Sequence, residues 1–259
     1  MQKLITSIFL IINVKTLVIT SLAIAATLIC RFMDFTADFP LTLVISAVVF
    51  PIVFSINAAY TRRETALAKY GSLKAHGHAI YLAVLYPSEK TNKEIQHQAK
   101  ELLGGLVEKI RELFISEAEN LREKERHVYQ QFSLLSFFIK EDLRELATSQ
   151  GDISLCDSHL TEMMEAFETM KHIYQYRTPQ TLRTFSRIFI TTLPVLYAPY
   201  FAFLAYDYST GLALMMPMLF TVTLVSLDNI QLHLENPFDQ IGEDDIHIDP
   251  VAFSNRLSA

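Results

Sequence analysis

The chain has 259 residues, of which 51% are hydrophobic, and its formal net charge is -6. This apolar fraction exceeds what the core of one soluble domain of ordinary composition contains, and the sequence shows no basic patch of the kind that binds nucleic acid. The two cysteines, Cys30 and Cys156, are too few for a disulfide framework and lack the spacing of a metal or redox site.

The N-terminal part of the chain predicts a helical membrane hairpin. Thr16–Ile29 is apolar apart from threonine and serine, and with part of 7–14 it reaches the roughly 20 residues that a membrane helix needs. Residues 1–12 have some features of a secretory signal, but no small-residue cleavage site with a polar mature start follows, so we expect them to continue into the span. After a short connection, 31–40, Leu41–Ala59 is a second apolar run.

Two further apolar runs, Ile188–Tyr206 and Gly211–Leu227, predict a second hairpin, because the connection 207–210 between them allows only a tight turn. Proline in the interior of a soluble helix costs about 3 kcal/mol, whereas membrane helices tolerate it when neighbouring helices satisfy the freed carbonyls. Such internal prolines occur in the last three runs, at Pro51, Pro194, Pro199 and Pro217.

Basic residues flank the apolar runs on one side. Arg62 and Arg63 follow the second run, Arg183 and Arg187 precede the third, and Lys15 could extend its ammonium from the first span to the headgroups. Lys and Arg favour the cytosolic side of a membrane. We therefore expect an integral multi-pass membrane protein whose termini and middle region face the cytosol or an organellar equivalent such as the stroma.

The polar middle region, 60–187, shows helical periodicity and no alternating strand pattern. Ser88 has the character of an N-cap, and a turn is expected near 151–154. The helices predicted here span Arg62–Tyr86, 88–114, 117–148 and 158–176.

The expected fold class is therefore all-α, with four membrane spans and a helical cytosolic region. Its predicted parts are a membrane hairpin at 1–59, the helical region at 60–187, a second membrane hairpin at 188–227 and an acidic C-terminal tail at 228–259.

No constellation of catalytic residues is evident. His76 and His78 are two positions apart on one predicted helix and point away from each other, so they cannot chelate one ion. We find no carboxylate or cysteine partner at ligand spacing for His97, His127, His159 and His172, no nucleophile elbow around a serine and no phosphate-binding glycine loop. Glu141 and Asp142 lie on a charged helix face. We expect no enzymatic activity and no required cofactor.

Ser46, Phe50 and Phe54 recur every four residues along the second apolar run and form one stripe, which Asn57 continues toward the basic end. A packing face against other spans accounts for this spacing. A pore-lining stripe accounts for it as well, because copies around a symmetry axis would form rings of phenyl groups that gate by dewetting, beside amide and arginine donors that attract anions. The second interpretation requires a homo-oligomer.

Five carboxylates lie within residues 239–249. Carboxylate oxygens are ligands for a hard cation such as Ca²⁺, but the spacing of an EF-hand loop is absent. A solvated acidic tail accounts for the composition equally well.

Two segments resemble the bestrophin family and its bestrophin-like relatives. In the first, Pro40–Arg63, an apolar helix ends in Phe54 and a polar, basic exit, which is similar to the family's pore helix. In the second, Glu235-Asn236-Pro237-Phe238 and Gly242-Glu243-Asp244-Asp245 are similar to the family's N-P-F-G-E-D-D stretch after the last span, with three residues intervening. The order and spacing of the four spans agree with the family as well.

The resemblance implies a homopentamer in a lipid bilayer, with one axial pore, a hydrophobic neck from the pore helix 41–59 and a helical cytosolic vestibule. Family members mostly pass chloride and other small anions, although some bacterial relatives prefer cations. The calcium-gated members clasp Ca²⁺ in the acidic stretch. The positions implied here are Ser46, Phe50 and Phe54 at the neck, with Ser46 in place of a bulky apolar residue, Asn57, Arg62 and Arg63 at the exit, and Asp244, Asp245 and Asp249 as calcium ligands.

The alternative is a membrane scaffold or interaction protein that retains the fold without conducting ions.

Overall fold

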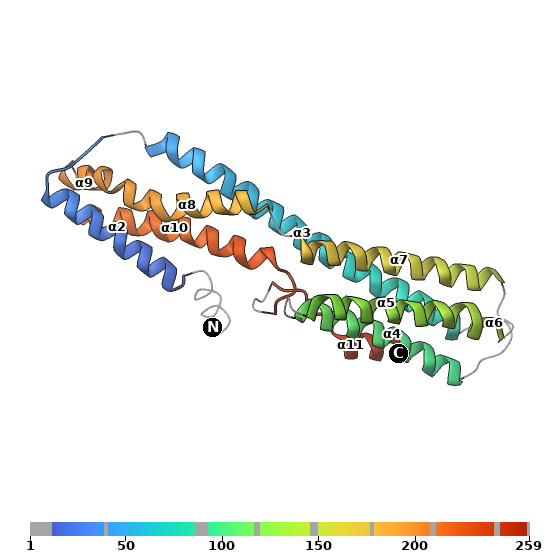
Figure 1. The fold of residues 1–259 in the computed structure, drawn as a ribbon. Coiled ribbons are helices and arrows are strands. Elements are labelled where there is room, and N and C mark those ends of the chain that lie inside the picture. The colour runs from blue at the N-terminus through green and yellow to red at the C-terminus, as the bar shows by residue number, and fades with distance from the viewer. Residues whose placement is uncertain are drawn as a thin grey trace. The chain divides into compact units, whose positions relative to one another are not determined.

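A computed structural model of the chain describes residues 12–38, 41–85, 93–116, 120–145, 150–176, 179–207, 211–240 and 244–257. Every regular element in these ranges is a helix, as the sequence predicts (Figure 1). The chain divides into two compact units: unit 1 comprises residues 1–62 and 177–236, and unit 2 comprises residues 63–176 and 237–259. The tail from residue 237 thus belongs with the polar helices and does not form a part of its own.

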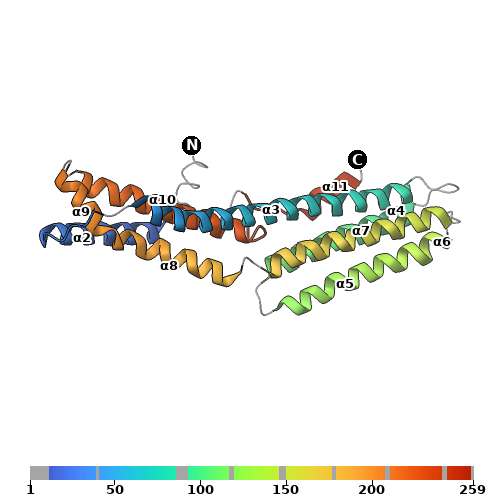
Figure 2. The ribbon, with the colours of Figure 1, turned by 90° about the horizontal axis from the view of Figure 1, so that it is seen from above.

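Unit 1 contains α2 (Val14–Phe32), α8 (Gln180–Leu196), α9 (Ala198–Asp207), α10 (Leu212–Glu235) and the first part of α3 (Leu41–Leu85). In Figures 1 and 2, α2 runs beside α8, α9 and α10, all of which it contacts. The core residues come from all five helices: Ile19, Val48, Ile52, Ile190, Leu193, Tyr197, Phe201, Leu224 and Val225.

Helix α2 begins at a capping box. The Asn13 side chain accepts a hydrogen bond from the Thr16 backbone N at 3.2 Å, and the Asn13 backbone N donates to Thr16 Oγ1 at 3.3 Å. Small side chains let membrane helices approach one another closely. The buried side chains of α2 are mostly small and follow steps of three and four: Thr16, Ile19, Thr20, Ala23 and Thr27.

Three helical segments of the described residues are long and apolar enough to cross a bilayer: Val14–Phe32, Arg183–Ala205 and Leu214–Glu235. They correspond to the first, third and fourth predicted spans. The predicted second span, Leu41–Ala59, is helical throughout and forms the first part of α3, although several of its side chains lie outside the described residues.

The third predicted run is not one helix, because α8 ends at Leu196 and α9 begins at Ala198. Pro199 lies in the first turn of α9, where proline is tolerated because the backbone N–H would have no helical partner. Its carbonyl accepts a hydrogen bond from the Ala37 backbone N at 3.4 Å. The fourth run also continues past its predicted end at Leu227, because α10 reaches Glu235.

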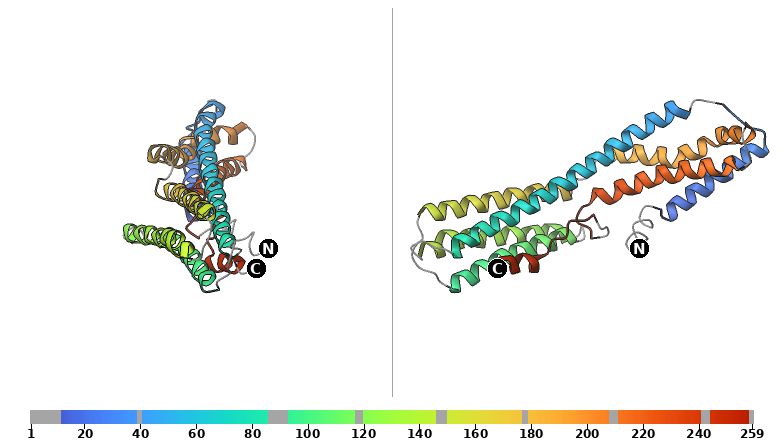
Figure 3. Two further views of the ribbon diagram at one scale, coloured as in Figure 1. Left: turned by 90° about the vertical axis from the view of Figure 1, so that its right-hand side faces the viewer. Right: turned by 180° about the vertical axis from the view of Figure 1, so that it is seen from behind.

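Unit 2 contains the rest of α3, α4 (Lys93–Ile115), α5 (Leu121–Phe137), the π-helix η2 (Phe138–Asp142), α6 (Leu143–Glu145), α7 (Gln150–Gln175) and α11 (Pro250–Leu257). Helix α4 packs on α5 and on α11, and α7 packs on α5 (Figure 3). Aromatic rings fill the centre: Phe114 stacks on Phe238 at 4.3 Å between centroids, and Phe132 and Phe114 both contact Phe167. Phe238 therefore anchors the segment after α10 in the unit 2 core.

Several predicted boundaries in the polar region are wrong. No separate helix begins at Arg62, because 58–66 contains neither glycine nor proline and nothing ends α3 before Leu85. The predicted turn at 151–154 is helical and forms the start of α7. The predicted helix 117–148 consists of α5, η2 and α6, and Ser88 lies outside the described residues.

The π-helix η2 follows α5 directly. The backbone N–H of Leu143 donates to the carbonyl of Phe138, five residues earlier, which is the π-helical hydrogen bond. Phe138 and Ile139 are adjacent, and both are buried. The wider turn accommodates two neighbouring side chains in the core.

Cys156 provides a test of the unit 2 core. Its side chain is fully buried on α7, and burial, reinforced by Asp152, raises the pKa of its thiol to about 11. Because the thiolate is the reactive form, we expect alkylation of native protein at pH 8 to be about 100-fold slower than that of unfolded protein, whose cysteine has an ordinary pKa. Iodoacetamide labelling of a Cys30→Ser variant in detergent, followed by intact mass, measures this. Equal native and unfolded rates would place Cys156 at the surface.

Candidate functional site

Phe50 and Phe54 lie one turn apart on α3 and are exposed. Their side chains are 63% and 66% accessible, and the two rings stack with centroids 6.2 Å apart. On the other side of the same helix, Val48 and Ile52 are buried in the unit 1 core. Helix α3 therefore has one face packed within unit 1 and another, carrying the two phenyl rings, that the described residues of the chain leave uncovered.

Ser46 is exposed one turn before Phe50, and its Oγ donates to the Thr42 carbonyl at 2.8 Å. Such a bond back to the preceding turn satisfies the hydroxyl within the helix. The exposed side of α3 thus bears one hydroxyl and two phenyl rings.

The three residues predicted at the exit have different surroundings. Asn57 is exposed, and its carbonyl accepts a hydrogen bond from Thr61 Oγ1 at 2.9 Å. Arg62 is half-buried, and burial lowers the pKa of its guanidinium while the nearby Glu235 raises it. Arg63 pairs with the Glu64 carboxylate, and its Nε donates to the Asp244 carbonyl at 2.8 Å. The charge of Arg63 is therefore compensated locally.

The three predicted calcium ligands also differ in their environment. Asp244 is exposed, and Asp245 is buried. The Asp249 carboxylate accepts from the Ala252 backbone N at 2.9 Å and so caps α11. The Asp249 backbone N donates to the Tyr70 hydroxyl at 3.2 Å, and burial is the main cause that raises the pKa of this phenol.

Among the residues that the structure describes, no three histidine, cysteine, aspartate or glutamate side chains are grouped to hold a metal ion. Glu243, the first acidic residue of the Gly242–Asp245 motif, lies outside those residues. Calcium binding by the acidic stretch stays a prediction.

Two ion pairs in unit 1 were not predicted from the sequence. The Lys15 ammonium, expected to reach the headgroups, pairs instead with the buried carboxylate of Asp228, and Arg183 pairs with the buried Glu235 at 3.0 Å. These contacts bring the starts of α2 and α8 to the end of α10. The sequence contains a signal for these pairs, because basic residues precede the first and third apolar runs and acidic residues follow the fourth.

Several histidines have ring or carboxylate partners in the structure. His76 Nδ1 lies 3.0 Å from His159 Nδ1 on another helix, and His97 Nδ1 lies 3.6 Å from the Glu101 carboxylate one turn along α4. The prediction that His97 has no carboxylate partner at ligand spacing is wrong, because Glu101 lies four residues later on the same helix.

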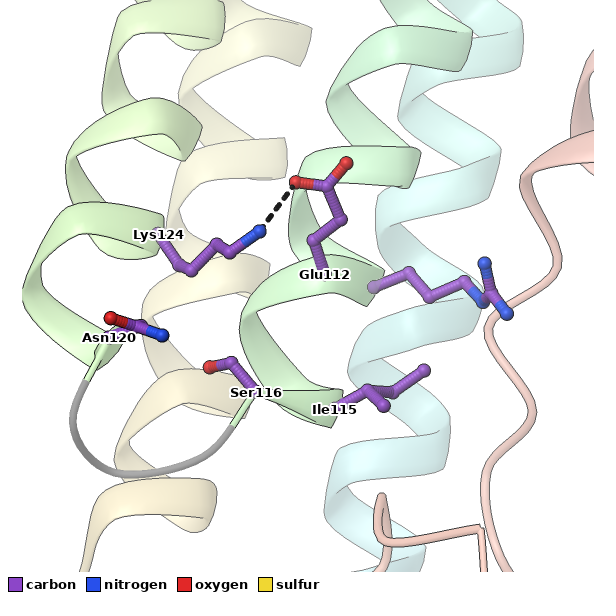
Figure 4. A pocket seen from close by; sticks show the side chains of 6 residues that line it. Glu112, Ile115, Ser116, Asn120 and Lys124 are labelled. Carbon is purple, nitrogen blue, oxygen red and sulfur yellow. Dashed lines mark hydrogen bonds and ion pairs between the residues drawn. The ribbon is translucent and has the colours of Figure 1, made fainter.

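A hollow of about 370 Å³ in unit 2 is lined by Arg111, Glu112, Ile115, Ser116, Asn120 and Lys124 (Figure 4). Glu112 accepts hydrogen bonds from Lys109 at 2.8 Å and Lys124 at 3.2 Å. The bond from Lys109 is the main cause that holds the pKa of this carboxyl below its usual range. Glu112 is therefore shared between two lysines.

No protein-family model and no curated protein matches the chain. Solved structures do match it. A bacterial bestrophin homologue from Klebsiella pneumoniae is 17% identical, with a TM-score of 0.72 over 94% of each chain. A single-residue variant of that homologue is also 17% identical, with a TM-score of 0.72 over 95% of this chain and 96% of the variant chain. A structure described as a membrane protein is 15% identical, with a TM-score of 0.74 over 95% of each chain. The chain has the fold of bacterial bestrophin homologues, which confirms the resemblance at the level of the fold.

Proposed function

We propose that this chain, which shares its fold with bacterial bestrophin homologues, is one subunit of a homopentameric membrane channel that passes chloride and other small anions down their gradients. Helices α2, α8 with α9, and α10 would cross the bilayer together with the first part of α3. The termini and the helices of unit 2 would face the cytosol or the stroma. We propose no enzymatic activity and no required cofactor.

The observation that carries the proposal is the exposed phenyl pair on α3. Phe50 and Phe54 are not used in the unit 1 core, although Val48 and Ile52 on the same helix are buried there. Large apolar side chains that a single chain leaves exposed mark a contact surface or a lipid-facing surface. Copies of α3 around a common axis would turn them into successive rings, which hold back hydrated ions until the rings separate.

Polar groups beyond the rings would bias the pore toward anions. Asn57 is exposed one turn after the phenyl pair, and Arg62 and Arg63 follow. Glu64 and the Asp244 carbonyl engage Arg63, and Glu235 lies near Arg62, so we propose that Asn57, Arg62 and Arg63 act together on anions. Calcium bound near Asp244, Asp245 and Asp249 is proposed as a regulator.

Flux through reconstituted protein tests the proposal. Purified protein in mild detergent is expected to have the mass of five chains, and liposomes containing it are expected to release chloride when a gradient is imposed. In planar bilayers with unequal salt, the reversal potential should follow chloride. A pentamer without flux at any voltage or pH would favour the non-conducting scaffold, and a reversal potential that follows the cation would overturn anion selectivity.

A further inference from the structure

Two histidines from different helices of unit 2 face each other. His76 lies on α3 and His159 on α7, with their Nδ1 atoms 3.0 Å apart and their ring centroids 5.2 Å apart at a tilt of 41°. Both side chains are half-buried. The proposed pore uses neither of them.

Two ring nitrogens at this distance share either a hydrogen-bonding proton or a metal ion. A neutral imidazole carries one N–H and one lone pair, so two lone pairs facing each other repel unless a proton or a metal ion lies between them. Burial, with the neighbouring His76, lowers the pKa of His159. When each ring carries its proton on Nε2, both Nδ1 lone pairs are available to one metal ion.

The separation of the two nitrogens fits ligands of one metal ion. Zinc binds imidazole nitrogen at about 2.0–2.1 Å, and two ligands of a tetrahedral ion are then about 3.3 Å apart. The observed 3.0 Å differs from this by a few tenths of an ångström. Octahedral ions place neighbouring ligands slightly closer together.

The backbone near the pair is held in place by close packing. A Cβ atom at Gly77, the residue after His76, would lie 3.3 Å from Met163 Cε and 3.1 Å from Phe253 Cζ. The absence of a side chain at Gly77 therefore lets α7 approach α3 next to the two rings. Leu73 and Ile80 on α3 and Met163 on α7 are fully buried, so little reorganisation of the two helices would be needed on binding.

A third ligand is available one turn along α7. Glu162 is three residues after His159, on the same side of the helix, and its side chain is exposed. Its charge favours the protonated form of His159, so the carboxylate is within electrostatic range of the ring. Because the described residues hold no ready group of three such ligands, Glu162 would have to rotate toward the pair, with water in the remaining positions.

We propose that His76 and His159 bind a divalent transition-metal ion of the zinc class through their Nδ1 atoms, with Glu162 as third ligand. The ion would link α3 to α7. Protons compete with the metal ion for the imidazole nitrogens, so affinity should fall as the pH is lowered.

Titration of the full-length protein tests this site. After treatment with EDTA, protein in detergent is titrated with ZnCl₂ against a chromogenic chelator. We expect one zinc ion per chain, and His76→Gln or His159→Gln should weaken binding by about tenfold or more. His97→Gln is the matched control, because His97 also lies near a carboxylate one turn away, and its affinity should equal that of the wild type. Equal affinity of all three variants and the wild type, or no zinc bound by the wild type, would overturn the site.

Three further measurements do not require the histidine variants to fold. Co²⁺ bound to the wild type should show d–d absorption with nitrogen ligation, and Glu162→Gln, an exposed substitution, should weaken zinc binding while the protein stays folded. X-ray absorption of the zinc-loaded wild type should show two imidazole ligands. A spectrum without imidazole scattering would mean that His76 and His159 share a proton and bind no metal.

Discussion

Replacing Phe50 and Phe54 together with alanine is expected to raise ion flux through the reconstituted protein. In the proposed pore these rings form the dewetted constriction, and lowering its barrier by 1.4 kcal/mol would increase the flux about tenfold. Both rings are exposed and contribute little to the unit 1 core, so the variant should fold. Single-channel conductance and chloride release from liposomes measure the effect.

Phe32→Ala is the matched control for this experiment. Phe32 ends α2, is 90% exposed and lies off the proposed pore helix, so the same loss of a phenyl group should leave the flux unchanged. Wild-type currents in a folded Phe50→Ala, Phe54→Ala double variant would show that the two rings do not form the constriction. An equal increase in the Phe32→Ala variant would point to general leak.

Replacing Phe167 with alanine is expected to lower the free energy of unfolding of unit 2 by about 3–5 kcal/mol, because the substitution removes a large buried side chain and leaves a cavity. Phe167 is fully buried on α7 and contacts the rings of Phe114, Tyr129 and Phe132. Urea titration in detergent, with alkylation of Cys156 as the readout of unfolding, measures the loss.

Phe137→Ala provides the comparison within the same unit. Phe137 ends α5, and its ring is exposed, so the same deletion creates no cavity in the isolated chain. We expect its effect on the unfolding of separated subunits to stay below about 1 kcal/mol. If Phe167→Ala and Phe137→Ala unfolded at the same urea concentration, the aromatic cluster would not hold unit 2 together.

The sequence predicts the helical fold because its periodicity and hydropathy are local properties. The apolar run at Thr16–Ile29 lies within α2, and the run at Gly211–Leu227 lies within α10 apart from its N-cap Gly211. The bestrophin resemblance rests on short segments whose order matches the fold. Boundaries were less predictable. Near Ala59 the residues of α3 change from apolar to polar, but their helix propensity stays similar. The helix therefore continues where the hydropathy pattern predicted a boundary.

The contacts between helices could not be predicted in this way. His76 and His159 are far apart in the sequence, and their meeting depends on how α3 and α7 pack. The pairing of Lys15 with Asp228 depends likewise on the antiparallel arrangement of α2 and α10. The stripe of Ser46, Phe50 and Phe54 was visible from spacing, but its role in a pore depends on neighbouring subunits.

The π-helical turn η2 between α5 and α6 keeps the apolar side chains before and after it on the same side of the helix. In an uninterrupted α-helix Leu143 would be rotated by about 80° from Leu135, whereas one extra residue in the turn brings it back to the same side. Leu135, Phe138, Ile139 and Leu143 are all buried. The chain at this point therefore carries one residue more than a regular helix needs, and the exposed Lys140 is the position where a shorter relative could lose a residue and keep the same core.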